Sequence, residues 1–473
     1  MSFWRTYHEF TKHTVEKIRN SSHSLDWVNM PDPFRHYEGV PVLDLPSSAP
    51  APKANALDIL RGRLGHCNTT DGSGLLSQLL FYSAAISATK VVPATGYRYS
   101  LRVNPSSGNL HPTEFHFATL GLHHWPDGLY HYRPSSHMTE QRATGDYTMG
   151  RGNLVFYLTT IAWREAWKYR DRAYRYCCHD IGHAAESLML AGRACGYHST
   201  PVYDFDDNQV ARVLGVEDEW PMMIVRIEGV PGWNRSAGSR HFMGGQPNRL
   251  SEEEVPYPMI MRMHEATKIR TDIGEPTLTS VVIERSIMTD ASFATVVRRR
   301  RSALDFRGGI ESISLAQLQT LLACAVRNRD FITLYLYVHR VNDLQAGLYR
   351  VHDDHLELLR PGDHRVAAAG LSLSQELAGN SCVTFSMAAD LERATSVHGD
   401  RGYRYSFFEA GAIGQSLYLA AEAMGFQSTG IGAFYDDAVH HYLGLDPKDA
   451  QVIYHFACGY AVKDNRITEG EHP

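Results

Sequence analysis

The sequence predicts an α+β fold that is built twice, as two tandem domains forming an intrachain pseudo-dimer with long central helices. Three observations lead to this prediction. A segment of 29 residues occurs twice, helix and strand patterns mix without regular βαβ units, and the repeated segment is apolar on nearly every side. A chain of 473 residues has room for two or three domains of ordinary size.

The two copies of the repeat keep a constant offset. Residues 172–200 read RAYRYCCHDIGHAAESLMLAGRACGYHST and residues 401–429 read RGYRYSFFEAGAIGQSLYLAAEAMGFQST, with 13 of 29 positions identical at an offset of 229. The register continues in the pairs Phe205/Phe434, Asp207/Asp436, Val210/Val439 and Leu214-Gly215/Leu443-Gly444. A repeat of this length is domain-sized, far beyond the roughly 20–50-residue periods of solenoids. We therefore expect a fused pair of related domains, with any active site where the halves meet.

Composition excludes several classes of protein. A hydrophobic content of 43% with 21% charged residues is typical of a soluble globular protein, and a net charge of −6 gives no sign of nucleic-acid binding. The first residues, MSFWRTYHEFTKHTVEKIRN, lack the apolar core of a signal peptide, and no membrane span is visible. We expect a cytoplasmic protein with no membrane partner.

Metal binding is not expected either. The seven cysteines form no CxxC pair and show no CxxH spacing. Cys177 and Cys178 lie on the apolar stripe of the repeated helix, which favours buried small hydrophobic side chains over a redox or metal role.

The first part of the chain comprises an N-terminal helix with an extended strap (1–55) and a first domain (56–244). A helix is predicted over Thr6–Ile18, followed by the Pro-rich strap PDPFRHYEGVPVLDLPSSAPAP. The first domain is predicted to contain, in order, helix Leu75–Ile86, loop Arg102–Pro112, strands Glu114–Leu120, Gly128–Tyr132 and Leu154–Ile161, the long helix, and strand Met222–Ile227.

A polar linker (245–279), with GGQPNRLSEEEVPYP, is expected to lead to a second domain (280–473). This domain repeats the order with helix Leu315–Val326, strand Phe331–Val338, turn-strand Gly347–Tyr349, strand Ser381–Ala388, the long helix, and strand Gln451–Phe456. Each long helix is predicted to run for about 28 residues, ~40 Å at 1.5 Å per residue, and to be buried on most sides.

Two motifs occur in the first half alone. Asn104–Pro112 reads NPSSGNLHP, whose small hydroxyls, glycine and amide suit close contact with a planar polar ligand, although an ordinary surface turn has the same composition. Lys168 and Tyr169 precede the long helix and could form a proton-transfer pair, although side by side they are more often unrelated surface residues.

Two other motifs occur in the second half alone. Arg298–Phe306 reads RRRRSALDF, in which arginine forks and a serine hydroxyl suit a phosphate monoester, although a solvated basic helix end reads the same way. Gly430–Phe434 reads GIGAF, which permits close approach of a ligand to the backbone but also suits a plain loop.

Together these motifs resemble the nitroreductase-like flavoprotein family and, within it, the SagB/ThcOx-type dehydrogenases that oxidise azoline heterocycles. The resemblance covers most of the chain and implies FMN bound between two α+β units. It implies that Arg300, Arg301 and Ser302 hold the phosphate, and that Pro105, Ser106, Ser107 and Asn109 contact the ring and ribityl chain. Gly430, Ile431, Gly432 and Ala433 would place backbone near the reactive ring nitrogen, and Lys168 and Tyr169 would handle protons.

The distribution of these motifs predicts one composite FMN site per chain, because each half has what the other lacks. The family usually has a second basic residue where this chain has Leu304. Arg298, Arg299, Arg307 or a late residue such as Lys463 is expected to compensate.

The resemblance implies oxidation of a thiazoline or oxazoline in a modified peptide to the azole, with dioxygen reoxidising the flavin. A cyclodehydratase is an implied partner, and further oligomerisation is open. Two alternatives stay open: an NAD(P)H-dependent nitro- or quinone reductase on the same scaffold, and a non-catalytic scaffold of a peptide-modifying complex.

Overall fold

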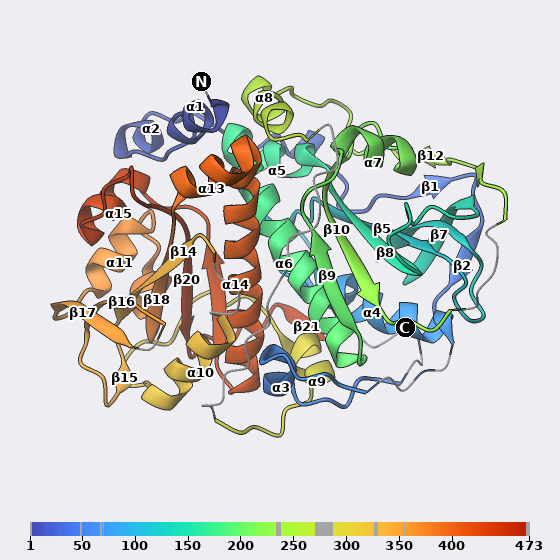
Figure 1. Ribbon diagram of the computed structural model, residues 1–473. Helices are drawn as coiled ribbons and strands as arrows, with labels where there is room; N and C mark the ends of the chain where they lie inside the picture. Colours follow the sequence, from blue (N-terminus) through green and yellow to red (C-terminus); the bar gives the residue numbers. More distant parts are fainter. Residues whose placement is uncertain are drawn as a thin grey trace.

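A computed structural model describes residues 2–47, 50–66, 69, 71–232, 238–269, 287–325, 330–353 and 355–469. Figure 1 shows two halves, each with an antiparallel sheet, on either side of two long helices that run side by side through the centre. The predicted α+β fold with two tandem units and central helices is confirmed. The boundary expected at 279/280 and the end of the helix expected at Val326 lie outside the described residues.

The two sheets have the same order of corresponding strands. The first runs β11-β7-β6-β5-β8-β10-β9, with β2 beside β7, and the second runs β17-β16-β14-β18-β20-β19. The strands of the first are β2 (Val42–Asp44), β5 (Thr113–Thr119), β6 (Gly128–Arg133), β7 (Met138–Thr144), β8 (Leu154–Thr160), β9 (His198–Val202), β10 (Trp220–Glu228) and β11 (His241–Phe242). Those of the second are β14 (Ile332–Val338), β16 (Gly347–Val351), β17 (Leu356–Pro361), β18 (Val383–Ala389), β19 (Gln427–Ile431) and β20 (Gln451–Gly459). The central strands of both are buried on both faces.

A third sheet joins the halves and borders the site described below. It runs β21-β3-β4 and consists of β3 (Ile86–Val91), β4 (Arg98–Arg102) and β21 (Ile467–Glu469), so the last strand of the chain pairs with the first half. The remaining short strands form two small ladders: β1 (Tyr37–Glu38) with β12 (Gln246–Pro247), and β13 (Ile313–Ser314) with β15 (Val341–Asn342).

The long helices, α6 (Ala173–Ala194) and α14 (Gly402–Ala423), have 22 residues each, not the predicted 28. Each ends before a glycine in the left-handed conformation, Gly196 (φ 88°) or Gly425 (φ 84°), after which a strand begins. They pack closely because glycines face each other: a Cβ on Gly182 would lie 2.9 Å from the Cα of Gly411 and 2.2 Å from the Phe408 carbonyl oxygen. Shorter helices α5 (Ala162–Tyr169) and α13 (Leu391–His398) precede them, each followed by a 3-10 turn.

The halves exchange buried ion pairs across the seam. Asp436, at the start of α15 (Asp436–Leu443), accepts from Arg172 at 3.0 Å and Arg175 at 2.9 Å, and all three side chains are buried. The mirror cluster, 229 residues away in each case, consists of Asp207 at the start of α7 (Asp207–Leu214), Arg401 and Arg404. Each half therefore supplies the arginines for the other half's aspartate.

The repeat extends further than the sequence comparison indicated. Helix α1 (Phe3–Phe10) ends in HEFTK (8–12), and α8 (Pro258–Ala266), inside the segment expected to be a linker, ends in HEATK (264–268). Arg175 donates through Nε to Thr11 Oγ1 at 3.0 Å, and its counterpart Arg404 donates to Thr267 Oγ1 at 2.7 Å. Both halves thus begin with the same helix, and the threonine after that helix accepts a hydrogen bond from an arginine of its own half.

The other differences are local. The helix predicted over Thr6–Ile18 is two helices, α1 and α2 (Val15–Arg19), because the backbone N–H of His13 donates to Asp436 instead of continuing the helix. Further helices are α3 (Ala56–Leu60), α4 (Gly72–Ala84), α9 (Phe293–Arg299), α10 (Leu315–Ala325), α11 (Arg365–Leu371) and α12 (Glu376–Asn380). Among the described residues, no helix is long and apolar enough to cross a membrane.

Candidate active site

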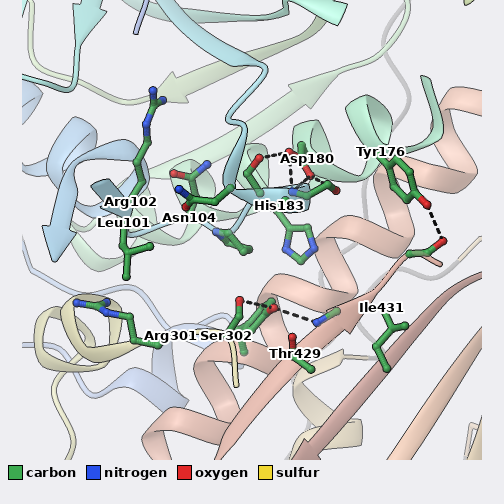
Figure 2. A pocket seen from close by; sticks show the side chains of 18 of the residues that line it. Leu101, Arg102, Asn104, Tyr176, Asp180, His183, Arg301, Ser302, Thr429 and Ile431 are labelled. Atoms are coloured by element: carbon green, nitrogen blue, oxygen red, sulfur yellow. Dashed lines mark hydrogen bonds between the residues drawn. The ribbon is translucent and has the colours of Figure 1, made fainter. Parts of the chain in front are cut away.

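A cavity of about 480 Å³ lies at the seam between the two halves. Figure 2 shows residues of α6 and of the β4–β5 connection facing residues of the second half across it. The structure brings all the sequence-predicted cofactor residues to this one cavity: Pro105, Ser106, Ser107, Asn109, Arg300, Arg301, Ser302, Gly430, Ile431, Gly432 and Ala433. Of the predicted proton-handling pair, Tyr169 lines the cavity and Lys168 lies behind its wall.

The serine-rich loop is held in place by a carboxylate on the long helix. Asp180 accepts hydrogen bonds from the hydroxyls of Ser106 and Ser107 and, at 3.1 Å, from the Ser107 backbone N–H. Burial raises the pKa of Asp180 to about 7, although these hydrogen bonds favour its charged form. The loop also contains two consecutive residues with positive φ, Gly108 (61°) and Asn109 (60°), so its backbone turns sharply against the cavity.

Lys168 and Tyr169 meet the loop at Gly108. A Cβ on this glycine would lie 2.7 Å from Tyr169 Oη and 3.0 Å from Lys168 Nζ, so both polar atoms sit against its Cα. Burial raises the pKa of Tyr169 well above its ordinary value. The two groups at the end of α5 therefore both contact Gly108, and Tyr169 and Gly108 line the cavity.

Arg300 is a buried cation that forms no ion pair with any carboxylate among the described residues. Its side chain is 4% exposed, and it donates through Nε to Val103 O at 2.9 Å and through Nη2 to Arg102 O at 3.1 Å. Within the described part of the chain Nη1 has no hydrogen-bond partner. Burial lowers the pKa of Arg300. Because an unpaired buried charge is costly, the arrangement favours an anionic ligand in the cavity.

The rest of the arginine–serine segment is fixed by neighbours. Ser302 Oγ lies 2.8 Å from Tyr418 Oη, which also accepts from the Gly430 backbone N–H at 2.9 Å. Arg301 donates to three carbonyls, including that of Ser87 in the first half at 3.1 Å. The segment is thus tied both to the glycine loop and to strand β3.

None of the four residues expected to compensate for Leu304 lines the cavity. Arg298 lies over the Phe81 ring, Arg299 is near Glu422, Arg307 pairs with Glu311, and Lys463 is exposed. Two further basic side chains on the wall come from the first half: Arg102 of β4, and Lys90 of β3, which pairs with Asp464 at 2.9 Å.

The glycines of GIGAF are required by aromatic neighbours. A Cβ on Gly430 would lie 1.9 Å from Tyr454 Oη, and one on Gly432 would lie 2.3 Å from a ring carbon of Tyr176. Tyr176 donates to the Gly432 carbonyl at 3.1 Å, which orients the loop from the opposite half. These contacts place bare backbone at the cavity surface.

Sequence reasoning missed the polar residues that α6 contributes. Asp180 and His183 lie on one face of this helix, and His183 Nε2 is 3.0 Å from Tyr454 Oη. Burial lowers the pKa of His183 to about 3, so it is neutral. The signal available was a polar i, i+3 pair on a helix that the sequence predicts to be buried on most sides. His179 and His183 also have a metal-like i, i+4 spacing, but the residues described include no cluster of three ligands able to hold an ion.

The mirror position is built differently. Glu409, the counterpart of Asp180, accepts from the backbone N–H groups of Phe331 at 3.1 Å and Ile332 at 3.2 Å, where β14 begins. The counterparts of Lys168 and Tyr169 are Val397 and His398. Both halves therefore have a helix carboxylate, Asp180 or Glu409, that accepts hydrogen bonds from backbone N–H groups. The serine-rich loop and the lysine–tyrosine pair belong to the first half.

A protein-family model described as the nitroreductase family matches residues 83–232 and 297–460, one segment in each half. The chain belongs to the nitroreductase family. Its members are mostly flavin-dependent oxidoreductases, and FMN is their typical cofactor.

This nitroreductase-family protein is similar to two solved structures and to one protein known by sequence. A solved structure from Anabaena variabilis, named as a candidate nitroreductase, covers 98% of this chain and is itself covered fully, with 26% identity and a TM-score of 0.78. A candidate nitroreductase of Methanocaldococcus jannaschii, MJ1384, is 32% identical over 116 residues, 24% of this chain and 59% of that relative's length. The E. coli microcin synthetase complex McbBCD is more distant, at 20% identity over 44% of this chain and 83% of that chain, with a TM-score of 0.32.

Proposed function

We propose that this nitroreductase-family protein is an FMN-dependent dehydrogenase that oxidises a thiazoline or oxazoline, or a similar C–N bond, in a peptide natural product to the azole. The observation that carries the proposal is the Lys168–Tyr169 pair at the edge of a cavity built by both halves. The SagB/ThcOx-type resemblance supplies the substrate class and suggests a cyclodehydratase as the source of the azoline.

The cavity residues fit FMN. Its volume of about 480 Å³ is within the range of cofactor sites. Arg300, with Nη1 unpartnered, would bind the phosphate together with Arg301 and Ser302. The serine-rich loop would contact the ring and ribityl chain, and the bare backbone of Gly430–Ala433 would lie beside the ring.

The cofactor and the cavity residues have different roles in the proposed oxidation. When bound, FMN supplies the hydride acceptor and a route for electrons to dioxygen. Lys168, in its neutral form, would take the proton from the substrate carbon, and Tyr169, which its raised pKa keeps protonated, would donate a hydrogen bond beside it. The two hydrogens lost by the azoline would appear in hydrogen peroxide. Asp180 keeps Ser106, Ser107 and Gly108 against this pair, so the base and the ring contacts are fixed relative to each other.

Lys168→Ala and Tyr169→Phe should each lower turnover of a thiazoline-containing peptide by about 100- to 10,000-fold without loss of FMN, since general acid–base catalysis contributes this much. The loss of two hydrogens from the peptide is followed by mass spectrometry. Val397→Ala and His398→Phe, at the mirror positions, are the controls and should keep full turnover. Full turnover in both Lys168→Ala and Tyr169→Phe would refute their role.

We expect one FMN per chain, because the serine-rich loop is in one half and the arginine–serine segment is in the other. The ratio is obtained from the flavin absorbance of a protein solution of known concentration. A ratio near two would contradict the composite site.

A reductase is the second candidate, because the relatives from Anabaena variabilis and Methanocaldococcus jannaschii are named as candidate nitroreductases. Anaerobic mixing with NADPH separates the two functions. Rapid bleaching of the flavin favours the reductase, and persistence of the oxidised spectrum favours the dehydrogenase.

A further inference from the structure

A second, smaller cavity of about 210 Å³ adjoins the first. One wall is the strap residues Met30–Phe34, and the other is strand β4. Tyr99, Arg102 and Asn109 line both cavities. The space between strap and strand, which we call the strap slot, therefore leads to the proposed cofactor cavity.

Strand β4 presents its free edge to the strap slot. It is the last strand in the order β21-β3-β4. The Tyr97 carbonyl faces the β3 side and accepts from Val92 N at 2.9 Å, whereas the Ser100 carbonyl faces away and accepts from Asn109 Nδ2 at 3.2 Å. Because backbone groups alternate along a strand, the N–H of Ser100 and the N–H and C=O of Arg98 point away from β3, toward the slot.

The strap cannot pair with this edge. Pro31 and Pro33 have no N–H. The N–H of Asp32 donates to Leu250 O at 2.9 Å, and that of Phe34 donates to the Asp32 carboxylate at 2.8 Å. The strap is thus a wall opposite β4 and does not occupy its hydrogen-bonding positions.

Two buried polar side chains also line the strap slot. Arg102 and His111 are 2% and 3% exposed, and among the described residues neither Arg102 Nε nor His111 Nδ1 has a hydrogen-bond partner. Phe34, Tyr97 and Tyr99 supply aromatic surface on both walls. Regularly spaced backbone groups, aromatic walls and a few buried polar atoms match an extended peptide.

We propose that the strap slot binds the peptide segment next to the reactive residue, which adds as a strand to the free edge of β4. The reactive residue then reaches the larger cavity past Tyr99, Arg102 and Asn109. This inference rests on the proposed function, since it assigns the peptide part of that substrate to a place.

Ser100→Pro tests the slot, with Ser100→Ala as the matched control. The one backbone hydrogen-bonding group that proline removes is the N–H of residue 100, which points away from β3, and proline is tolerated on an edge strand in that orientation. Two substrates are compared on the FMN-loaded protein: a thiazoline amide without flanking residues, and the same thiazoline inside a hexapeptide. Ser100→Pro should raise the KM of the hexapeptide about tenfold, the effect of one lost hydrogen bond, and leave the small amide unchanged. Ser100→Ala should leave both unchanged.

If Ser100→Pro changes the KM of both substrates equally, or of neither, the proposal that the strap slot binds the peptide is wrong. If neither substrate is oxidised by the unaltered protein, the proposed function fails instead. The slot is then tested by calorimetry with the hexapeptide in its thiazole form: weaker binding to Ser100→Pro than to Ser100→Ala supports it, and equal or absent binding overturns it.

Discussion

Arg300→Ala is expected to yield a protein that no longer retains FMN on purification. Arg300 is a buried cation on the cavity wall whose Nη1 has no hydrogen-bond partner among the described residues, so its removal would take away charge-assisted bonds to the phosphate. Loss of one or two such bonds corresponds to a weakening of FMN binding of about 100-fold or more. Flavin titration followed by fluorescence quenching measures the change in Kd.

Two further variants separate charge from folding. Arg300→Lys keeps the charge but not the planar fork, so an intermediate Kd is expected. Arg299→Ala removes a neighbouring arginine whose side chain is 66% exposed, and it should bind FMN normally. The thermal unfolding of apo Arg300→Ala reports on the fold, because Val103 O and Arg102 O lose their donor. Unchanged FMN affinity in Arg300→Ala would contradict the phosphate assignment.

Asp436→Asn is expected to lower the free energy of unfolding by about 3 kcal/mol, because it leaves Arg172 and Arg175 buried without a carboxylate. Arg172 also donates to the Gly432 carbonyl at 3.3 Å, so this variant should weaken FMN binding as well. Asp207→Asn removes the mirror carboxylate and should cost similar stability while FMN affinity is kept. Urea unfolding and flavin titration on both variants provide the comparison.

The ion pairs of Asp436 with Arg172 and Arg175 predict a pH dependence of stability. Burial alone would raise the pKa of Asp436, but Arg172 and Arg175 outweigh burial and hold it well below its ordinary value. Its contribution to stability is thus complete above the unfolded-state pKa of about 4 and is lost as the pH falls toward the folded-state pKa. Urea unfolding below pH 5 should therefore show a shallower acid loss in Asp436→Asn. An identical acid profile would mean that the ion pairs contribute nothing.

The internal repeat and the motifs predicted much of what the structure shows. The resemblance assigned residues of three distant segments, beginning at Pro105, Arg300 and Gly430, to one ligand. In the structure these residues line one cavity. Short segments rich in apolar and aromatic residues located the central strands, which are buried on both faces. The roles of these residues, and the domain boundaries, stay predictions.

The remaining features depend on contacts that a single sequence does not contain. Asp180 and His183 look like ordinary polar residues of a helix until the loop and Tyr454 are placed beside them. The second copy of the N-terminal helix was missed because the offset rises from 229 residues in the long helix to 256 between His8 and His264. A gap of that kind interrupts the alignment of two short segments, whereas the shared ion-pair cluster identifies them in space.

The cavity borders on residues of both halves, and the last strand, β21, pairs with the first half. In a pair of separate subunits such a pocket would form only by a bimolecular encounter and would be lost on dilution. Here the covalent connection fixes the local concentration of one half around the other. Assembly of the pocket is consequently part of the folding of one chain.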